Sequence, residues 1–229
     1  MKELNNKYQT TYNLVIKQLE SFFGIDDNDK VVLKQGVEIA LESCAYCFSK
    51  INDKYFVDKK GDILFNTFHS GQYTIFLYYL SRMMYTKSLA DRSLLDKIYY
   101  LNRLLNSVDL FYEVELPEVF YVDHPLGSVI GRAKIAKNFS FRQRCTVGNN
   151  KGIYPVLSEN VIMLNGSTIV GKCLIGSNTI FGAHSFVKDL DVPDNSMVVG
   201  RYPNHRFLPL SKEIKAEYFD IFNRSNGNL

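Results

Sequence analysis

A histidine beside an aspartate is the pair of residues in this sequence best suited to chemistry. Asp123-His124 is followed by Pro125 and Gly127, which favour a turn. A histidine side chain can exchange a proton near neutral pH and so can act as a general base. Such a base needs a carboxylate that fixes its tautomer. Asp109, fifteen residues earlier, can supply one, although on spacing alone an Asp–His pair is more often a surface hydrogen bond.

A six-residue repeat over 157–192 positions this pair. Large apolar residues recur every six positions: Leu157, Met163, Ile169, Ile175, Phe181 and Val187. Four positions after the first five of them come small or β-branched residues: Val161, Ser167, Cys173, Thr179 and Ser185. This period fits neither a helix nor an alternating strand and is typical of a parallel β-helix, whose short coils stack on one another. The same rhythm earlier, at Ile135, Phe141 and Val147, predicts a stack interrupted only between Val147 and Leu157.

The first hundred residues have helical periodicity instead. Apolar spacing predicts four helices, at 13–23, with Gly24 as a C-cap, at 31–50, with Asp29 as an N-cap, at 68–85 and at 93–106. We therefore predict an α+β chain with a helical domain at 1–107, a β-helix domain at 108–210, and a C-terminal helix and tail at 211–229. The helix at 211–223 is expected to cap the open end of the stack, and residues 224–229 are expected to fray.

Composition excludes several classes of function. The chain has 229 residues, of which 46% are hydrophobic and 22% charged, and a net charge of +3. This is the composition of a soluble globular protein, and so slight a charge without a base-stacking motif argues against nucleic-acid binding. The N-terminus lacks the apolar core of a signal peptide, and the apolar run at 74–80 is too short to span a bilayer. We expect a cytoplasmic protein.

The remaining cysteines and histidines suggest little further chemistry. Cys44 and Cys47 form a CxxC pair, for which a redox role is open, but no thioredoxin-like pattern surrounds it. Cys145 and Cys173 occupy small inward positions of the repeat and are expected to pack. The four histidines are scattered without the spacing of metal ligands, so no metal is expected. His69 and Gln72 share one face of the third predicted helix, where they either reach a site or belong to the core.

Several of these residues together resemble a known family. They are Phe68-His69, Val108-Asp109, Asp123-His124 with Gly127 and Gly131, Gln143, Val147-Gly148, the loop before Pro155, and the repeats up to Phe186-Val187. From about residue 68 to 207 the chain resembles the serine acetyltransferases among the hexapeptide-repeat acyltransferases. It looks closest to the serine acetyltransferase-like proteins of bacterial surface-polysaccharide gene clusters. The interval from Asp109 to His124 equals that family's interval between its catalytic aspartate and histidine.

This resemblance implies a left-handed parallel β-helix assembled as a homotrimer, or a dimer of trimers, with active sites between subunits. Acetyl-CoA would be the acyl donor, His124 the base and Asp109 the residue that orients it. Backbone amides near Gly148 and Asn149 would stabilise the oxyanion. The pantetheine arm would lie against Asn165, Gly166, Gly182 and Ala183, and its phosphates would meet Lys188, Arg201 or Arg206.

One departure from the family bears on the acceptor. The family's loop carries an Arg-His pair whose arginine holds the carboxylate of serine, whereas this chain has Ile153-Tyr154 there. Isoleucine cannot pair with a carboxylate, and Tyr154 suits a sugar ring. His69, Asp123 and Gln143 are further candidates for acceptor binding, and Arg142 and Arg144 for reading a phosphate.

The sequence therefore predicts an acetyl-CoA-dependent O-acetyltransferase that acts on a sugar hydroxyl in surface-polysaccharide biosynthesis. The alternatives are a serine acetyltransferase with an altered pocket and a β-helix scaffold without catalysis. N-acylation of an amino sugar is also open.

Overall fold

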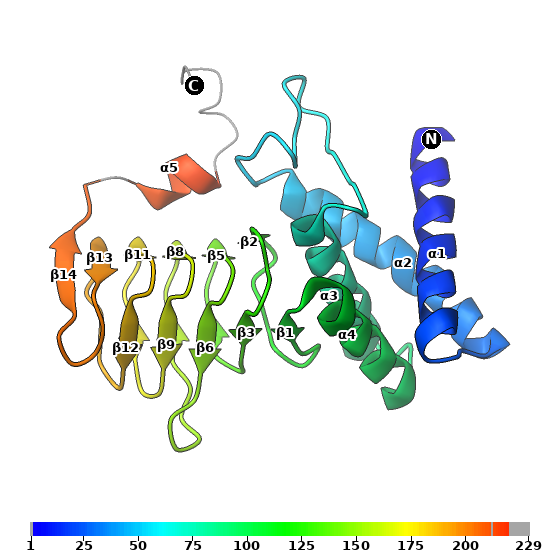
Figure 1. Cartoon of the computed structure of the whole chain (residues 1–229). Helices are drawn as coiled ribbons and strands as arrows, with labels where there is room; N and C mark the ends of the chain where they lie inside the picture. Colours follow the sequence, from blue (N-terminus) through cyan, green and yellow to red (C-terminus); the bar gives the residue numbers. More distant parts are fainter. Residues whose placement is uncertain (1, 212, 220–229) are drawn as a thin grey trace.

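The computed structural model describes residues 2–211 and 213–219, in which helices precede a stack of short strands (Figure 1). The helical part contains α1 (Lys2–Phe22), α2 (Asp27–Phe48), α3 (Ser70–Thr86) and α4 (Arg92–Asn106). All four predicted helices are present, but the first begins eleven residues earlier than predicted. Among the described residues, no helix is both long and apolar enough to cross a membrane.

Side chains that precede the helices determine where they begin. The predicted N-cap of α2, Asp29, is wrong, and the N-cap is Asp26. Asp26 Oδ1 accepts a hydrogen bond from the Asp29 amide at 2.8 Å. Asp29 completes the capping box by accepting a hydrogen bond from the Asp26 amide at 3.3 Å. Asp91 caps α4 by accepting from the Leu94 amide, and His69 caps α3. These bonds satisfy amides that have no partner within the first turn.

Helix α3 is the centre of the helical part. Every residue from Gly71 to Ser81 is buried, which explains why its sequence is apolar on all sides. The helix contacts α2, α4 and strand β2. Its Tyr78 hydroxyl donates to the Val114 carbonyl at 2.8 Å and accepts from the Leu116 amide at 3.0 Å. Helix α3 therefore holds the segment that leads into β2.

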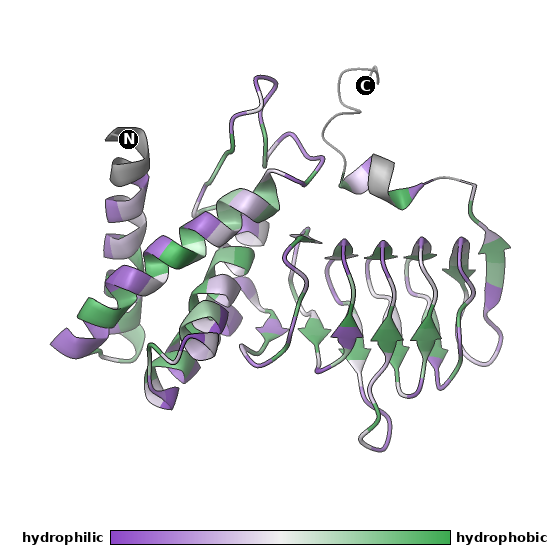
Figure 2. Cartoon of the chain, turned by 180° about the vertical axis from the view of Figure 1, so that it is seen from behind, coloured by the Kyte–Doolittle hydropathy of each residue, from purple (hydrophilic) through white to green (hydrophobic). Residues whose placement is uncertain are grey.

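The strands form three sheets around the stack, with apolar residues along them (Figure 2). Sheet A contains β1 (Asp109–Leu110), β3 (Val129–Ile130), β6 (Thr146–Gly148), β9 (Thr168–Val170) and β12 (Phe186–Lys188). Sheet B contains β4 (Lys134–Ile135), β7 (Val156–Leu157) and β10 (Leu174–Ile175). Sheet C contains β2 (Phe120–Val122), β5 (Phe139–Phe141), β8 (Val161–Met163), β11 (Thr179–Phe181), β13 (Ser196–Val199) and β14 (Arg206–Pro209).

The predicted six-residue repeat forms the interior of the stack. All of its large apolar members from Leu157 to Val187 are at most 1% exposed. Parallel pairing places each one above its counterpart, as in the column Val122, Phe141, Met163 and Phe181. The predicted interruption is a loop closed by a bridge between Asn150 and Ile153. The predicted fold class, a helical domain followed by a left-handed parallel β-helix, is confirmed.

The short helix α5 (Ile214–Tyr218) does not cap the open end of the stack, contrary to our prediction. Its Ile214 amide donates to Asn178 at 2.8 Å, and its Tyr218 carbonyl accepts from the Asn52 amide at 2.9 Å. The segment thus returns along the stack towards the helices (Figure 1). The end is covered instead by β14, which pairs antiparallel with β13 and covers its exposed edge. The predicted fraying at 224–229 concerns residues outside the described ones.

Candidate active site

His124 lies on a protruding corner between sheets C and A. The chain takes seven steps from Val122 to Val129 in this coil, but five between their partners Phe141 and Thr146 in the next. The two extra residues widen the corner, where His124 adopts a left-handed backbone conformation with φ 49°. Its side chain is 69% exposed. The corner therefore presents an imidazole to solvent from a rigid scaffold.

Asp123 is the carboxylate that contacts His124. Its Oδ1 lies 3.4 Å from His124 Nε2, and its Oδ2 lies 3.5 Å from Arg142 Nε on the next coil. The Asp123 side chain is only 24% exposed. The Asp123 amide donates to the Phe141 carbonyl at 3.2 Å, which fixes the residue against β5. Three side chains thus form one row, with the aspartate in the middle.

Asp109 lies beside this corner but is engaged by other residues. Its backbone amide donates to the Ser128 carbonyl at 2.8 Å, which places it next to the corner of His124. Its Oδ1 accepts a hydrogen bond from Tyr99 at 2.7 Å, and Arg103 lies 4.0 Å from its Oδ2. Burial and this hydrogen bond raise the pKa of Tyr99 to about 12. The structure shows no direct contact between the Asp109 and His124 side chains, so their pairing stays a prediction.

The predicted acceptor residue Gln143 and the predicted pantetheine residues lie along the same corner of later coils. Gln143 follows β5, Asn165 and Gly166 follow β8, and Gly182 and Ala183 follow β11. Backbone hydrogen bonds join these corners into a ladder, from Gly166 to Gln143 at 2.9 Å and from His184 to Asn165 at 2.9 Å. The stacking therefore brings together, in one column below His124, residues that are far apart in the sequence.

Stacking of the coils also explains why residues 166 and 182 of this column are glycines. A Cβ atom on Gly166 would lie 2.6 Å from His184 Nδ1, and one on Gly182 would lie 2.9 Å from the Val198 carbonyl oxygen. Both positions are thus occupied by the following coil. Gln143 Oε1 is buried and has no hydrogen-bond partner among the described residues. Contact of Gly166 and Gly182 with a pantetheine arm, and of Gln143 with the acceptor, remains a prediction.

A second group of predicted residues lies at the opposite end of the sheet A strands. Gly148 and Lys188 end β6 and β12 there, and the loop that follows β6 carries Asn149 and Tyr154. Asn149 Nδ2 lies 3.3 Å from the Tyr154 hydroxyl, and its Oδ1 accepts from the Gly152 amide at 3.1 Å. Within one chain the structure does not bring these residues to His124.

His69 has a structural role that sequence reasoning missed. As the N-cap of α3, its Nδ1 accepts a hydrogen bond from the Gln72 amide at 3.3 Å. Gln72 uses its own side chain to bind the Asn66 amide and the Tyr55 carbonyl. A Cβ atom on Gly71 would meet both His69 Cε1 and the Val122 carbonyl, so the ring lies near the strand that leads to Asp123. His69 is thus a cap residue close to the candidate site.

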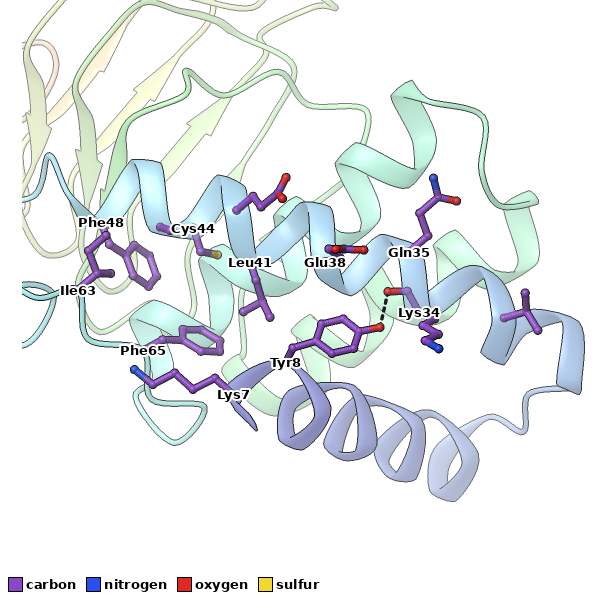
Figure 3. Close-up of a pocket in the computed structure, with 13 residues that line it drawn as sticks. Lys7, Tyr8, Lys34, Gln35, Glu38, Leu41, Cys44, Phe48, Ile63 and Phe65 are labelled. Carbon is purple, nitrogen blue, oxygen red and sulfur yellow. Dashed lines mark hydrogen bonds between the residues drawn. The ribbon is translucent and has the colours of Figure 1, made fainter. Parts of the chain in front are cut away.

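Two other features of the helical part lie away from this site. A groove of about 650 Å³ between α1 and α2 contains none of the predicted site residues (Figure 3). Cys44, which lines it, and Cys47 are buried free thiols, and burial raises the pKa of Cys47 to about 11. A redox pair needs an accessible, easily ionised thiol, so the open redox interpretation of CxxC loses its support.

Solved structures of serine acetyltransferases share this architecture. The enzyme of Neisseria gonorrhoeae superimposes with a TM-score of 0.65 at 22% identity, over 85% of this chain and 77% of that one. A structure of that enzyme in complex with serine superimposes with a TM-score of 0.62 at 25% sequence identity, over 84% of this chain and 80% of that one. The Brucella abortus enzyme in complex with coenzyme A superimposes with a TM-score of 0.63 at 18% sequence identity, over 80% of this chain and 76% of that one. This chain has the serine acetyltransferase fold.

The predicted resemblance is therefore confirmed for the fold, helical domain included. No family model matches the sequence, and no curated protein matches it. A special likeness to the proteins of polysaccharide gene clusters stays a prediction. Because one fold can carry several activities, the reaction has to be argued from the site.

Proposed function

We propose that the protein is an acetyl-CoA-dependent O-acetyltransferase with His124 as its general base. The observation that carries this proposal is the widened corner, which holds an exposed imidazole beside the Asp123 carboxylate. The fold supports it, since structures of this fold have been solved with coenzyme A. The predicted donor residues Asn165, Gly166, Gly182 and Ala183 form a column that starts at this corner, as an extended arm would require.

The reaction would follow from the position of the imidazole. His124 takes the proton of the acceptor hydroxyl while its oxygen attacks the thioester carbon of acetyl-CoA. The carbon–sulfur bond then breaks, and the thiolate receives that proton, which leaves an acetyl ester and free coenzyme A. Asp123 stabilises the imidazolium that exists between these two transfers. Asp109, held by Tyr99, would orient the ring in place of Asp123 if the imidazole turned towards it, so that one ring nitrogen stays free for the acceptor's proton.

For the acceptor, we propose a sugar hydroxyl of a surface polysaccharide or its precursor. The loop residue that would pair with the carboxylate of serine is Ile153, which is 50% exposed and offers no charge. Serine remains the second candidate, and the comparisons favour it, because one of the similar enzymes was solved in complex with serine.

We also propose that the active protein is a homotrimer. Sheet B presents Val156 and Leu174 at 39% and 57% exposure on adjacent strands. Large side chains of this kind are commonly covered by another subunit. Tyr154 and Asn149 lie across sheet A from His124, so they would complete a site only if a neighbouring copy supplied them. This arrangement would place each active site between two subunits.

The proposal is tested by measuring free thiol released from acetyl-CoA in the presence of serine, neutral sugars, uronic acids and sugar phosphates. We expect His124→Ala to lower the turnover at least a hundredfold, and His205→Ala, near the far end of the stack, to leave it unchanged. Full activity of His124→Ala would refute the mechanism. A scaffold without catalysis would release no thiol. Acetyl-CoA would also not stabilise it, whereas a protein that binds acetyl-CoA gains roughly 2.7 kcal/mol of stability at a hundred times the dissociation constant.

A further inference from the structure

Two arginines lie directly below the corner that carries His124. Residues 142–144 form the next corner of the stack, and each end of it touches the corner above. Arg142 lies against Asp123 at the start of the upper corner, with Nε 3.5 Å from Oδ2. At the other end, the Arg144 amide donates to the Leu126 carbonyl at 2.9 Å. The His124 corner is thus supported at both ends by residues that carry a positive charge.

The side chain of Arg144 follows the upper corner. A Cβ atom built on Gly127 would lie 3.5 Å from Arg144 Cγ, so the arginine stem runs beside that glycine. Arg144 has a left-handed backbone with φ 58° and an exposed side chain. Among the side chains that the structure describes, no carboxylate lies within ion-pair distance of its guanidinium.

The charges at this point do not balance. Asp123 is the carboxylate between Arg142 and His124, and only the Nε of Arg142 faces it. The terminal nitrogens of Arg142 form no ion pair in the described part of the chain, and its side chain is 37% exposed. The Asp53 carboxylate accepts hydrogen bonds from the Tyr121 hydroxyl at 2.9 Å and the Tyr55 amide at 2.7 Å and forms no ion pair with either arginine. Arg142 therefore has one carboxylate partner, Asp123, which also contacts the candidate base, and Arg144 has none among the described side chains.

The phosphates of coenzyme A are poorly placed to balance this charge. If the thioester reacts at His124, the phosphates lie at the far end of the extended pantetheine arm, several coils away. The acceptor is then the component of the reaction that can bring an anionic group next to His124. Guanidinium is well suited to such a group, because its planar donors match the oxygens of a carboxylate or a phosphate.

We infer that the acceptor carries a carboxylate or phosphate group, which Arg142 and Arg144 bind while its hydroxyl lies against His124. This inference rests on the proposed acetyl transfer. It also gives the missing loop arginine a replacement, because Arg142 brings a cation to the site from a different corner. A uronic acid, a sugar phosphate and serine all have this chemistry, whereas a neutral sugar does not.

The test compares matched acceptors that differ in charge. Thiol release is measured with methyl glucoside, methyl glucuronide, glucose 6-phosphate and serine, and each anionic acceptor is expressed as a ratio of kcat/KM to the neutral glucoside. We expect at least one anionic acceptor to exceed the glucoside about ten- to a hundredfold, the effect of one or two hydrogen bonds to a charged group. The anionic acceptor with the highest ratio of kcat/KM then shows whether the enzyme prefers a sugar or serine.

Variants then assign the preference to the arginines. Arg142→Gln and Arg144→Gln should each lower that ratio at least fivefold, and Arg92→Gln, on the exposed surface of α4, should leave it unchanged. The ratio is informative even if Arg142→Gln also disturbs Asp123, because such damage would slow both acceptors alike. Arg144→Gln leaves Asp123 untouched and provides the independent check.

The outcomes separate the two hypotheses. Equal turnover of neutral and anionic acceptors, or an unchanged ratio in both variants, would overturn the anionic acceptor and leave acetyl transfer standing. Absence of thiol release with every acceptor would overturn the proposed function itself, and the inference with it.

Discussion

The contact between Gly71 and Val122 joins the helical domain to the strand that leads into the candidate site. A Cβ atom on Gly71 would lie 2.3 Å from the Val122 carbonyl oxygen, whereas real Cβ atoms essentially never approach closer than 3.0 Å. In a Gly71→Ala variant, α3 and β2 would have to separate by roughly 0.7 Å or more. The clash involves backbone on both sides, so no side-chain rotation can relieve it.

The cost follows from overpacking of a rigid core, which is typically about 1–3 kcal/mol. We expect the upper end, because α3 is buried along its whole length and cannot shift freely. In a chain of this size each kcal/mol lowers the melting temperature by about 2–4 °C, so Gly71→Ala should lower it by about 6–12 °C. The displaced Val122 directly precedes Asp123-His124. The rate of thiol release, measured at a temperature well below the melting temperature, should therefore also fall several-fold, because small misplacements of reacting groups slow the reaction.

Ser70→Ala is the matched control, since Ser70 is the exposed first residue of the same helix. Melting is followed by circular dichroism for the wild type and both variants. If Gly71→Ala and Ser70→Ala both melt within 2 °C of the wild type, the close approach of α3 to β2 is wrong.

Two further predictions concern Asp109 and the cysteines. Tyr99→Phe removes the 2.7 Å hydrogen bond to Asp109 and should slow thiol release several-fold with a small change in melting temperature. Tyr100→Phe, one position along and 51% exposed, should not, and equal rates would remove Tyr99 from the site. The four buried thiols, among them Cys47 with its pKa raised to about 11, should resist a thiol reagent at pH 8 and react only after unfolding. Rapid labelling of Cys44 or Cys47 in the folded protein would contradict that burial.

Part of the site is visible in the sequence because the repeat determines it. The column from Met163 to Phe181 repeats with the geometry of one coil, so periodicity alone predicts which residues face inward. Asp123-His124 is recognisable because its turn residues place it at a corner. In both cases the determining interactions are between residues close in sequence or one coil apart.

The partners of these residues depend on contacts that no local pattern encodes. Tyr99 meets Asp109 because α4 packs against β1, and the orientation of a helix on a sheet is decided by its whole buried face. The sequence therefore predicts only that Tyr99 lies in the helix at 93–106, without a partner. The pairing of Asp109 with His124 stays a prediction, and the contact to the imidazole that the structure shows comes from Asp123.

The β-helix, its inward residues, the helical domain and the corner that carries His124 all follow from the amino-acid sequence alone. Only the tertiary structure decided that this corner is two residues wider than those below it and that Arg142 pairs with Asp123. It also decided that α5 returns to the helices and does not close the stack. The two groups of features differ in how far apart the interacting residues lie in the fold. A repeat encodes the interactions of adjacent coils, whereas charge pairs between corners and the path of a terminal segment follow from how the finished coils and helices pack together.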